Sequence, residues 1–257
     1  MAHMSWSSRR RTLYASGIIL AIVAVSAVPV ARLLYHAPTC SDGIQNQGET
    51  GVDTGGPCTL LDTATLQPES VLWVRAFPVR ASEYAATAYI QNPNKEAGVM
   101  SAAYKFSFYD ANNVLVAERA GTTAILPGAI TPVYAAQIVS GSRVIAHSFF
   151  EFTEPLVWVR AHNPTGTLSI AHARAENIAL SPSVSADVTD TAVTDLSAVT
   201  FVATVFDGAG NALASSQTIV PMLSAGKTQQ IVFTWPSPFS YVPARIDVLP
   251  VMRPVAE

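Results

Sequence analysis

The sequence predicts an all-β protein, with two β-sandwich domains in tandem after one N-terminal transmembrane helix and a short disulfide-tied stalk. Three observations support this prediction. A run of about twenty uncharged residues follows three arginines near the N-terminus. Two cysteines bracket a polar segment, and short segments of alternating apolar residues fill the rest of the chain.

The uncharged run is Thr12–Ala31, and it follows Arg9–Arg11. Twenty helical residues rising about 1.5 Å each span roughly the 30 Å of a bilayer's hydrocarbon core. We therefore predict a transmembrane anchor over residues 12–35. Because positively charged flanks stay on the cytoplasmic side, residues 1–11 are expected to form a cytoplasmic tail. The bulk of the chain is then extracytoplasmic, held at the cell membrane.

A cleaved signal peptide begins in the same way, and this alternative stays open. Val25–Ala27 contains the small residues of a cleavage site. However, apolar residues continue through Leu33, Leu34 and Tyr35, whereas a signal peptide has an apolar region of only about 7–15 residues. Both alternatives place the rest of the chain outside the cytoplasm.

The composition excludes several classes of function. Charged residues make up 13% of the chain and its net charge is −3, so no nucleic-acid surface is indicated. The sequence has no P-loop, no dinucleotide-binding glycine motif, no G-x-S-x-G motif and no His or Cys spacing that suits zinc. We therefore predict that the protein is not an enzyme and, with one exception in the stalk, binds no cofactor.

The stalk covers residues 36–69 and contains the two cysteines of the chain, Cys40 and Cys58. In an oxidising compartment two such cysteines are expected to pair with each other. The loop between them carries four side chains with oxygen atoms, and two interpretations of these stay open: turns in a spacer, or a site for a hard cation such as Ca²⁺. These side chains are Asp42, Asn46, Glu49 and Asp53.

From Ser70 onward, β-branched and aromatic residues alternate with polar ones, and turn residues recur at short intervals. Many short strands of this kind are typical of β-sandwiches. The Ala-rich stretch around Ile170–Leu180 is interpreted as a loop or a short helical turn. The expected strands cover residues 71–77, 85–91, 103–110, 114–120, 131–138, 144–152, 156–161, 184–189, 197–206, 212–218, 228–234 and 245–251.

An internal repeat divides this region in two. Phe106–Asn113 matches Ala203–Gly210, and in both an alternating strand enters an Asp/Asn/Gly turn that is typical of a hairpin. The offset between the copies grows from 85 to 97 residues, so the second copy contains an insertion, most simply at Asn163–Pro182. We predict one domain over residues 70–153 and another over residues 154–257.

Each copy also contains the sequence Trp-Val-Arg-Ala, with Trp73 and Arg75 in the first copy and Trp158 and Arg160 in the second. The two-residue period of a strand places the Trp and the Arg of each pair on one face. In one interpretation the Trp faces the core and the Arg lies at its rim. In the other both contact a partner, since Trp and Arg dominate interaction hot spots.

The repeat, taken with Asn92–Asn94 and Trp235–Phe239, resembles the FxLYD-type immunoglobulin-like domains of bacterial envelope proteins. The order of anchor, cysteine loop and β region looks like that of membrane-anchored proteins of candidate-phyla-radiation bacteria. Cys40–Cys58 is similar to cysteine-rich modules of bacterial surface proteins, with Thr54 in place of their middle cysteine. The resemblance implies extracytoplasmic immunoglobulin-like folds without catalytic residues.

Together these features predict a single-pass envelope protein that displays two immunoglobulin-like domains for binding or scaffolding. Its expected partner is another envelope protein or a surface polymer, which the sequence does not identify. The alternative is a structural subunit of a surface assembly, a homo-oligomer formed through pairing of sheet edges.

Overall fold

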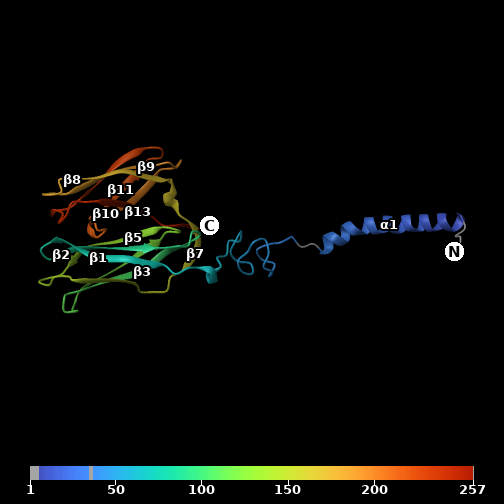
Figure 1. The fold of residues 1–257 in the computed structure, drawn as a ribbon, viewed down its shortest axis with the longest axis horizontal. Coiled ribbons are helices and arrows are strands. Elements are labelled where there is room, and N and C mark those ends of the chain that lie inside the picture. The colour runs from blue at the N-terminus through green and yellow to red at the C-terminus, as the bar shows by residue number, and fades with distance from the viewer. Residues whose placement is uncertain (1–5, 35–36, 257) are drawn as a thin grey trace. The chain divides into compact units, whose positions relative to one another are not determined.

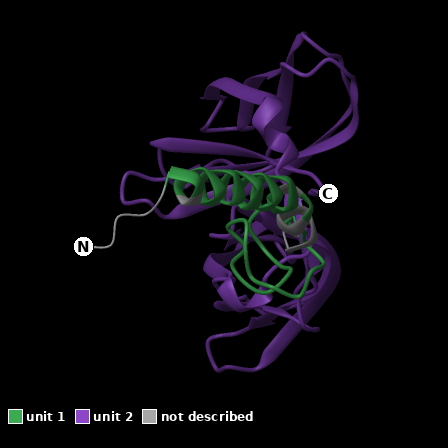
Figure 2. Ribbon diagram, turned by 90° about the vertical axis from the view of Figure 1, so that its right-hand side faces the viewer, with its two compact units in different colours: residues 1–58 green, residues 59–257 purple. Residues whose placement is uncertain are grey.

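The computed structural model describes residues 6–34 and 37–256. The chain is mostly β, with 51% of its residues in strands and 12% in helix. It divides into two compact units, Met1–Cys58 and Thr59–Glu257 (Figure 2).

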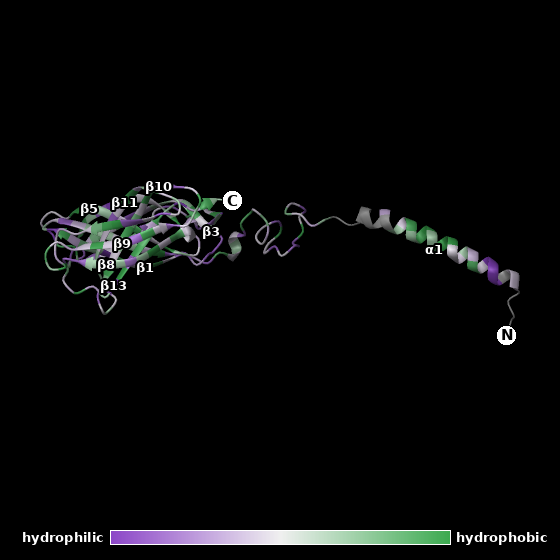
Figure 3. Cartoon of the chain, turned by 90° about the horizontal axis from the view of Figure 1, so that it is seen from above, coloured by the Kyte–Doolittle hydropathy of each residue, from purple (hydrophilic) through white to green (hydrophobic). Residues whose placement is uncertain are grey.

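The first unit contains helix α1 (Trp6–Leu34) and the cysteine loop (Figure 1). The segment Arg9–Ala27 is long and apolar enough to cross a membrane, and Figure 3 shows hydrophobic residues along its middle. The predicted apolar helix is thereby confirmed, although an anchor and a signal sequence both satisfy this criterion. The helix begins at Trp6, so the arginines lie within its first turns. Tyr35 and His36, at the predicted junction of anchor and stalk, lie outside the described residues.

The second unit begins with a short 3-10 turn, η1 (Thr63–Thr65), and continues as strands joined by tight turns. Each expected strand overlaps an observed one. The first half contains β1 (Ser70–Arg80), β2 (Glu83–Gln91), β3 (Ala97–Tyr109), β4 (Leu115–Ile125), β5 (Ile130–Val139), β6 (His147–Phe152) and β7 (Trp158–His162). The second half contains η2 (Pro164–Thr167), β8 (Leu168–Glu176), β9 (Ser183–Asp190), β10 (Leu196–Phe206), β11 (Ala212–Leu223), β12 (Thr228–Thr234), β13 (Arg245–Val251) and β14 (Val255–Ala256).

Strand β8 corrects the interpretation of the Ala-rich stretch around Ile170–Leu180 as a loop or helical turn. Residues 168–176 pair with β9, with an irregularity between Ala171 and Arg174, where His172 adopts a φ of 53°. Ala has low β propensity, but pairing with a well-formed neighbouring strand outweighs this local preference. The strand lies within the insertion expected at Asn163–Pro182.

The described strands form antiparallel sheets in the orders β1-β2-β5, β14-β7-β3-β4 (with β6 also on β3), β11-β10-β13 and β12-β9-β8. The first two sheets enclose one apolar cluster, and the last two enclose another. The first cluster is built from Tyr84, Ala86, Ala88, Ile90, Tyr104, Phe106, Phe108, Val133, Ala135 and Ile138. The second includes Val184, Val188, Val199, Phe201, Val205, Leu223, Ile231, Phe233 and Trp235.

A third apolar cluster joins the two halves of this unit, between the sheets of β2 and β10. It contains Phe77 and Tyr89 from the first half and Phe206 and Ala212 from the second, with Trp73 packed against it. Both middle strands are therefore buried on both faces, over residues 84–90 of β2 and 201–206 of β10. Burial raises the pKa of the Tyr89 hydroxyl.

Strand pairing crosses the boundary expected between residues 153 and 154. Strand β7 pairs with β3 through Ala97–Arg160 and Val99–Trp158. Strand β14, at the C-terminal end of the described chain, pairs in turn with β7 (Figure 1). That the parts of the chain on either side of this boundary fold on their own stays a prediction.

The two hairpin turns of the repeat have matching hydrogen bonds. In the first, Asp110 Oδ1 accepts from the backbone N–H groups of Asn112 and Val114, at 2.9 and 3.0 Å. In the second, Asp207 Oδ1 accepts from those of Ala209 and Asn211, at 2.9 and 2.8 Å. Each Asp side chain therefore stabilises the backbone of its own turn. This is what is expected of an Asp at the start of a tight turn between two strands.

Candidate functional site

The cysteine loop is closed by a disulfide between Cys40 and Cys58, whose Cα atoms lie 5.5 Å apart. This confirms the expected pairing. Glu49 is buried in the loop, 6% exposed, and its Oε1 lies 3.0 Å from Cys58 Sγ. Its Oε2 accepts hydrogen bonds from the backbone N–H groups of Asn46 and Asp53, each at 3.2 Å. The Glu49 carboxylate thus organises the centre of the loop.

The other proposed cation ligands also bind the loop itself. Asp42 accepts from the backbone N–H groups of Thr39 and Ile44 and from the Asn46 side chain. The hydrogen bond from Asn46 is the main reason why the pKa of Asp42 is lowered. Asp53 accepts from the Gly43 N–H at 3.0 Å. These contacts are those expected of a spacer, and cation binding by this loop stays a prediction.

The Trp and Arg of the first repeated sequence lie on one face of β1, at the junction of the two halves. The ring of Trp73 lies 4.4 Å from that of Tyr89 and 6.0 Å from that of Phe206, between centroids. Arg75, two residues further along β1, is exposed and lines a groove beside this cluster. The first Trp is therefore a packing residue, while Arg75 is accessible.

The second pair lies in a different environment, within the first half of the unit. Trp158 packs against the cluster of Val99, Ala102 and Ile125. The Arg160 side chain is only 14% exposed and forms an ion pair with Glu96 at 3.2 Å. The two repeated sequences thus differ in accessibility, although they match in sequence.

The junction groove is the recess, of about 610 Å³, between the β1–β2 hairpin, β11 and the loop that follows β12. Its lining is apolar and aromatic apart from two arginines and two serines. It is lined by Arg75–Ala81, Tyr84, Leu213, Ala214 and Trp235–Tyr241. A volume of this size fits a segment of a partner molecule.

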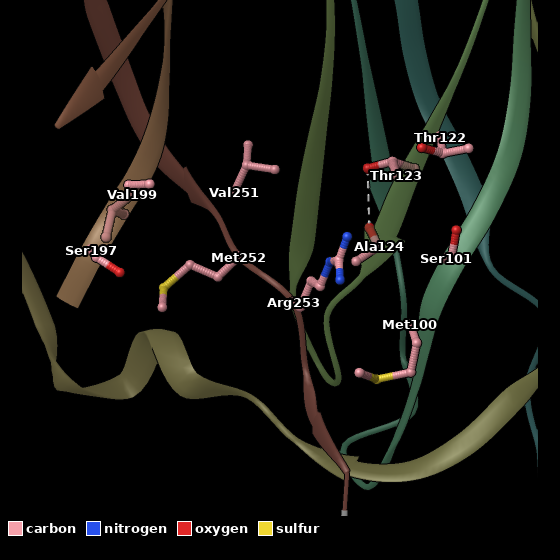
Figure 4. A pocket seen from close by; sticks show the side chains of 11 residues that line it. Met100, Ser101, Thr122, Thr123, Ala124, Ser197, Val199, Val251, Met252 and Arg253 are labelled. Carbon is pink, nitrogen blue, oxygen red and sulfur yellow. Dashed lines mark hydrogen bonds between the residues drawn. The ribbon is translucent and has the colours of Figure 1, made fainter. Parts of the chain in front are cut away.

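A second hollow, of about 380 Å³, lies where β3 and β4 approach β10 and the end of β13 (Figure 4). Its lining combines two methionines, Met100 and Met252, with four hydroxyl-bearing residues, Ser101, Thr122, Thr123 and Ser197 (Figure 4). Arg253 is its single charged residue. The hollow has no acid–base pair, so its lining suits the binding of a small polar molecule better than catalysis.

Titratable side chains elsewhere form few clusters. Over residues 6–34 and 37–256, the group of Cys40, Glu49 and Cys58 has the spacing of a metal site, but both sulfurs are used in the disulfide. His172 Nδ1 lies 3.0 Å from the Asp187 carboxylate on the outer face of β8 and β9. No Ser, Thr or Cys side chain has a hydrogen bond to this histidine within the described part of the chain, so the pair lacks a nucleophile.

No family model and no curated protein matches the chain. Solved structures with some likeness include red sea bream transglutaminase, with 11% identity, a TM-score of 0.24, and coverage of 71% of this chain and 31% of that one. A β-glucuronidase of glycoside hydrolase family 2 has 12% identity and a TM-score of 0.23, over 66% of this chain and 24% of that one. Another β-glucuronidase, from Bacteroides uniformis, has 18% identity and a TM-score of 0.19, over 67% and 22%. The chain spans less than a third of each, and such low TM-scores support no argument about activity.

The sequence identified Arg75 but not the groove around it. The opposite wall, Trp235–Tyr241, comes from a loop far away in the sequence, which local patterns cannot relate to β1. The high content of aromatic and proline residues in this loop was the signal in the sequence that could have pointed to the groove.

Proposed function

We propose that the protein is a single-pass envelope protein, with its N-terminus in the cytoplasm, that displays two immunoglobulin-like β-sandwiches outside for binding or scaffolding. The observation that supports this most is the Cys40–Cys58 disulfide, which follows shortly after an apolar helix preceded by arginines. Disulfides persist in oxidising compartments, so the residues after the helix belong on the extracytoplasmic side.

The immunoglobulin-like arrangement is supported by the pairing of sheets. Each half places two antiparallel sheets on either side of its own apolar cluster, and the matching Asp110 and Asp207 turns lie at equivalent points. Sandwiches of this kind are built from such pairs of sheets.

At the junction groove, binding fits better than catalysis because the residues that line the groove include no general base beside a nucleophile. The junction groove contains no carboxylate, histidine or cysteine, but offers accessible arginines beside aromatic rings. Arg and aromatic residues are enriched where proteins recognise partners. The partner is an envelope protein or a surface polymer, and an enzymatic role has no support in the groove's chemistry.

Site-specific photo-crosslinking in native membranes tests this function. A photoreactive amino acid at Tyr241, which is 67% exposed in the groove, is expected to yield a discrete adduct. The same probe at Val193, which is 95% exposed and outside the groove, is the matched control. If no exposed position of the β unit, Tyr241 included, gives an adduct, the binding function fails.

The alternative is a surface assembly formed through sheet edges. It is favoured by the long strand β4, which pairs with β3 alone among the described strands and carries the exposed Leu115 at its start. Concentration-dependent oligomers of the purified protein, with crosslinks from β4 to a second copy, would support assembly. A monomer at all concentrations would exclude it.

A further inference from the structure

We propose that the junction groove binds an extended, acidic polypeptide segment of the partner. This inference rests on the binding function proposed above and specifies the chemistry that the partner presents.

The charge of the groove points to an anion. Arg75 and Arg80 are both exposed and line the groove, and no Asp or Glu does. Within the described residues neither arginine forms an ion pair. Other arginines of the β unit do have carboxylate partners: Arg143, Arg160, Arg174 and Arg245. Glu83 lies opposite Arg80 across the β1–β2 pairing but forms no ion pair with it in the described structure, so both guanidinium groups are available to a ligand with negative charges.

The spacing of the two arginines fits an extended chain. They are five residues apart on β1, which corresponds to roughly 17 Å at the rise of a strand. A regular strand would place them on opposite faces. The register of β1 against β2 shifts between Pro78 and Arg80, and both arginines line the same groove. An extended peptide has the same rise per residue, and its alternate side chains share a face, so two acidic side chains four or six positions apart can both reach the arginines.

The floor of the groove can take the side chains between those two acids. Phe77, Tyr84 and Trp235 are buried there, at 4%, 7% and 8% exposure, and their rings provide an apolar surface. Because these rings are already buried, contact with them removes from water mainly the apolar surface of the peptide's own side chains. An acidic segment with apolar residues between its two carboxylates therefore fits the lining.

The opposite wall is already fixed in the unbound protein. The Trp235 indole N–H donates to the Ser215 carbonyl at 3.1 Å, and the Ser237 hydroxyl donates to the Val79 carbonyl at 3.0 Å. The rings of Trp235 and Phe239 meet edge to face, 5.1 Å apart. Little ordering of this loop is then needed on binding, which lowers the entropic cost of association.

A polypeptide is favoured over an anionic sugar polymer by the backbone of β1. Strand β1 pairs with β2 alone among the described strands. Its other edge leaves backbone groups that an extended peptide can pair with, and alternate peptide side chains would then enter the groove. Pro78 lacks an N–H, so this pairing is expected on the Arg75 side of the proline.

Fluorescence anisotropy with the full-length protein in nanodiscs of uncharged lipid tests the proposal. The probe is a labelled ten-residue peptide of Val and Thr with Glu at positions 3 and 7, which lie on one face of an extended chain. Binding is expected to weaken as salt rises, and a peptide with Gln at both positions should bind at least about tenfold more weakly. The double variant Arg75→Gln/Arg80→Gln should lose a similar factor.

The matched control is Arg119→Gln/Lys227→Gln, which removes two exposed positive charges of the same unit outside the groove. This variant should bind the probe as the wild type does, and equal melting temperatures would show that both variants are folded. Equal binding of the Glu and Gln peptides, or an equal loss in both double variants, would overturn the proposal. So would binding of polygalacturonate in place of the peptide.

Failure of this inference can be told apart from failure of the binding function. If the probe does not bind but Tyr241 still yields its crosslinked adduct, the function stands and the acidic partner class is wrong. If both experiments are negative, the groove is not a binding site.

Discussion

The indole of Trp73 meets the ring of Phe206 edge to face, with 6.0 Å between their centroids and 89° between their planes. Trp73 lies in β1 and Phe206 in β10, so this contact links the two halves of the repeat. Aromatic pairs in this geometry contribute about 0.5–1.5 kcal/mol beyond the burial of their surfaces. The halves are therefore joined by a specific aromatic contact as well as by the connecting chain.

Truncation of this contact should destabilise the β unit. We expect Trp73→Ala to reduce the free energy of unfolding by about 2–4 kcal/mol, because a large, partly buried ring is lost. For a unit of this size that corresponds to a melting temperature lower by about 4–16 °C. Val193→Ala, at an exposed position, should change it by less than about 2 °C. An unchanged melting temperature in Trp73→Ala would show that the junction contributes nothing to stability.

Fragments can test the division into domains. Residues 70–153 are expected to fold as a β protein with a cooperative melt, because they contain the strands around the first core. Residues 70–162 should melt at a higher temperature, since they retain the pairing of β7 with β3. Circular dichroism of both fragments provides the measurement. If the fragment of residues 70–153 is unfolded while the fragment of residues 70–252 is folded, the two-domain prediction is wrong.

Acid should weaken both hairpin turns. Hydrogen bonds to the carboxylate, from the Val114 N–H above all, lower the pKa of Asp110, and those from Asn211 lower the pKa of Asp207. A carboxyl whose pKa is lower in the folded state stabilises the fold above its unfolded pKa of about 4, and this contribution is lost as the pH falls further. The melting temperature should thus fall below pH 4, and less steeply in Asp110→Asn/Asp207→Asn. If the melting temperature falls equally steeply with pH in the wild type and in the double variant, the two turns are excluded as a cause of the acid sensitivity.

Loss of the disulfide should affect the first unit alone. In Cys40→Ser/Cys58→Ser we expect the loop to become sensitive to proteases, because closing a loop of this length contributes roughly 3 kcal/mol. The melting temperature of the second unit should stay unchanged, since it begins after Cys58. Mass spectrometry of the protein isolated from its native source should find Cys40 linked to Cys58 within one chain. Free thiols, or a link between two chains, would contradict this.

The orientation in the membrane can be tested with a reporter fused after Glu257. In the proposed orientation, which follows from the arginines at 9–11, the C-terminus lies outside the cytoplasm. An alkaline phosphatase fusion is then expected to be active, and a fluorescent protein that folds only in the cytoplasm is expected to be dark. Replacing the three arginines with Gln should reduce the fraction of correctly oriented chains. A C-terminus that is accessible from the cytoplasm would overturn this orientation.

The sequence by itself determined the features that depend on neighbouring residues. The uncharged run specified a helix because its length and apolarity suffice, and Asp110 and Asp207 specified hairpins because each holds its own turn. The pairing of Cys40 with Cys58 followed from the presence of two cysteines. Alternation located the strands except β8 and the short β14. At β8, Ala-rich composition hid a strand that pairing with β9 stabilises.

Only the tertiary structure decided how those strands combine. Trp73 and Trp158 have the same local sequence, yet one packs against Phe206 across the junction and the other against Val99 within the first half. Likewise, Arg75 is accessible while Arg160 pairs with Glu96. Contacts between residues this far apart depend on which sheet faces meet, and that is determined by the burial of apolar surface over the whole unit rather than by any local pattern.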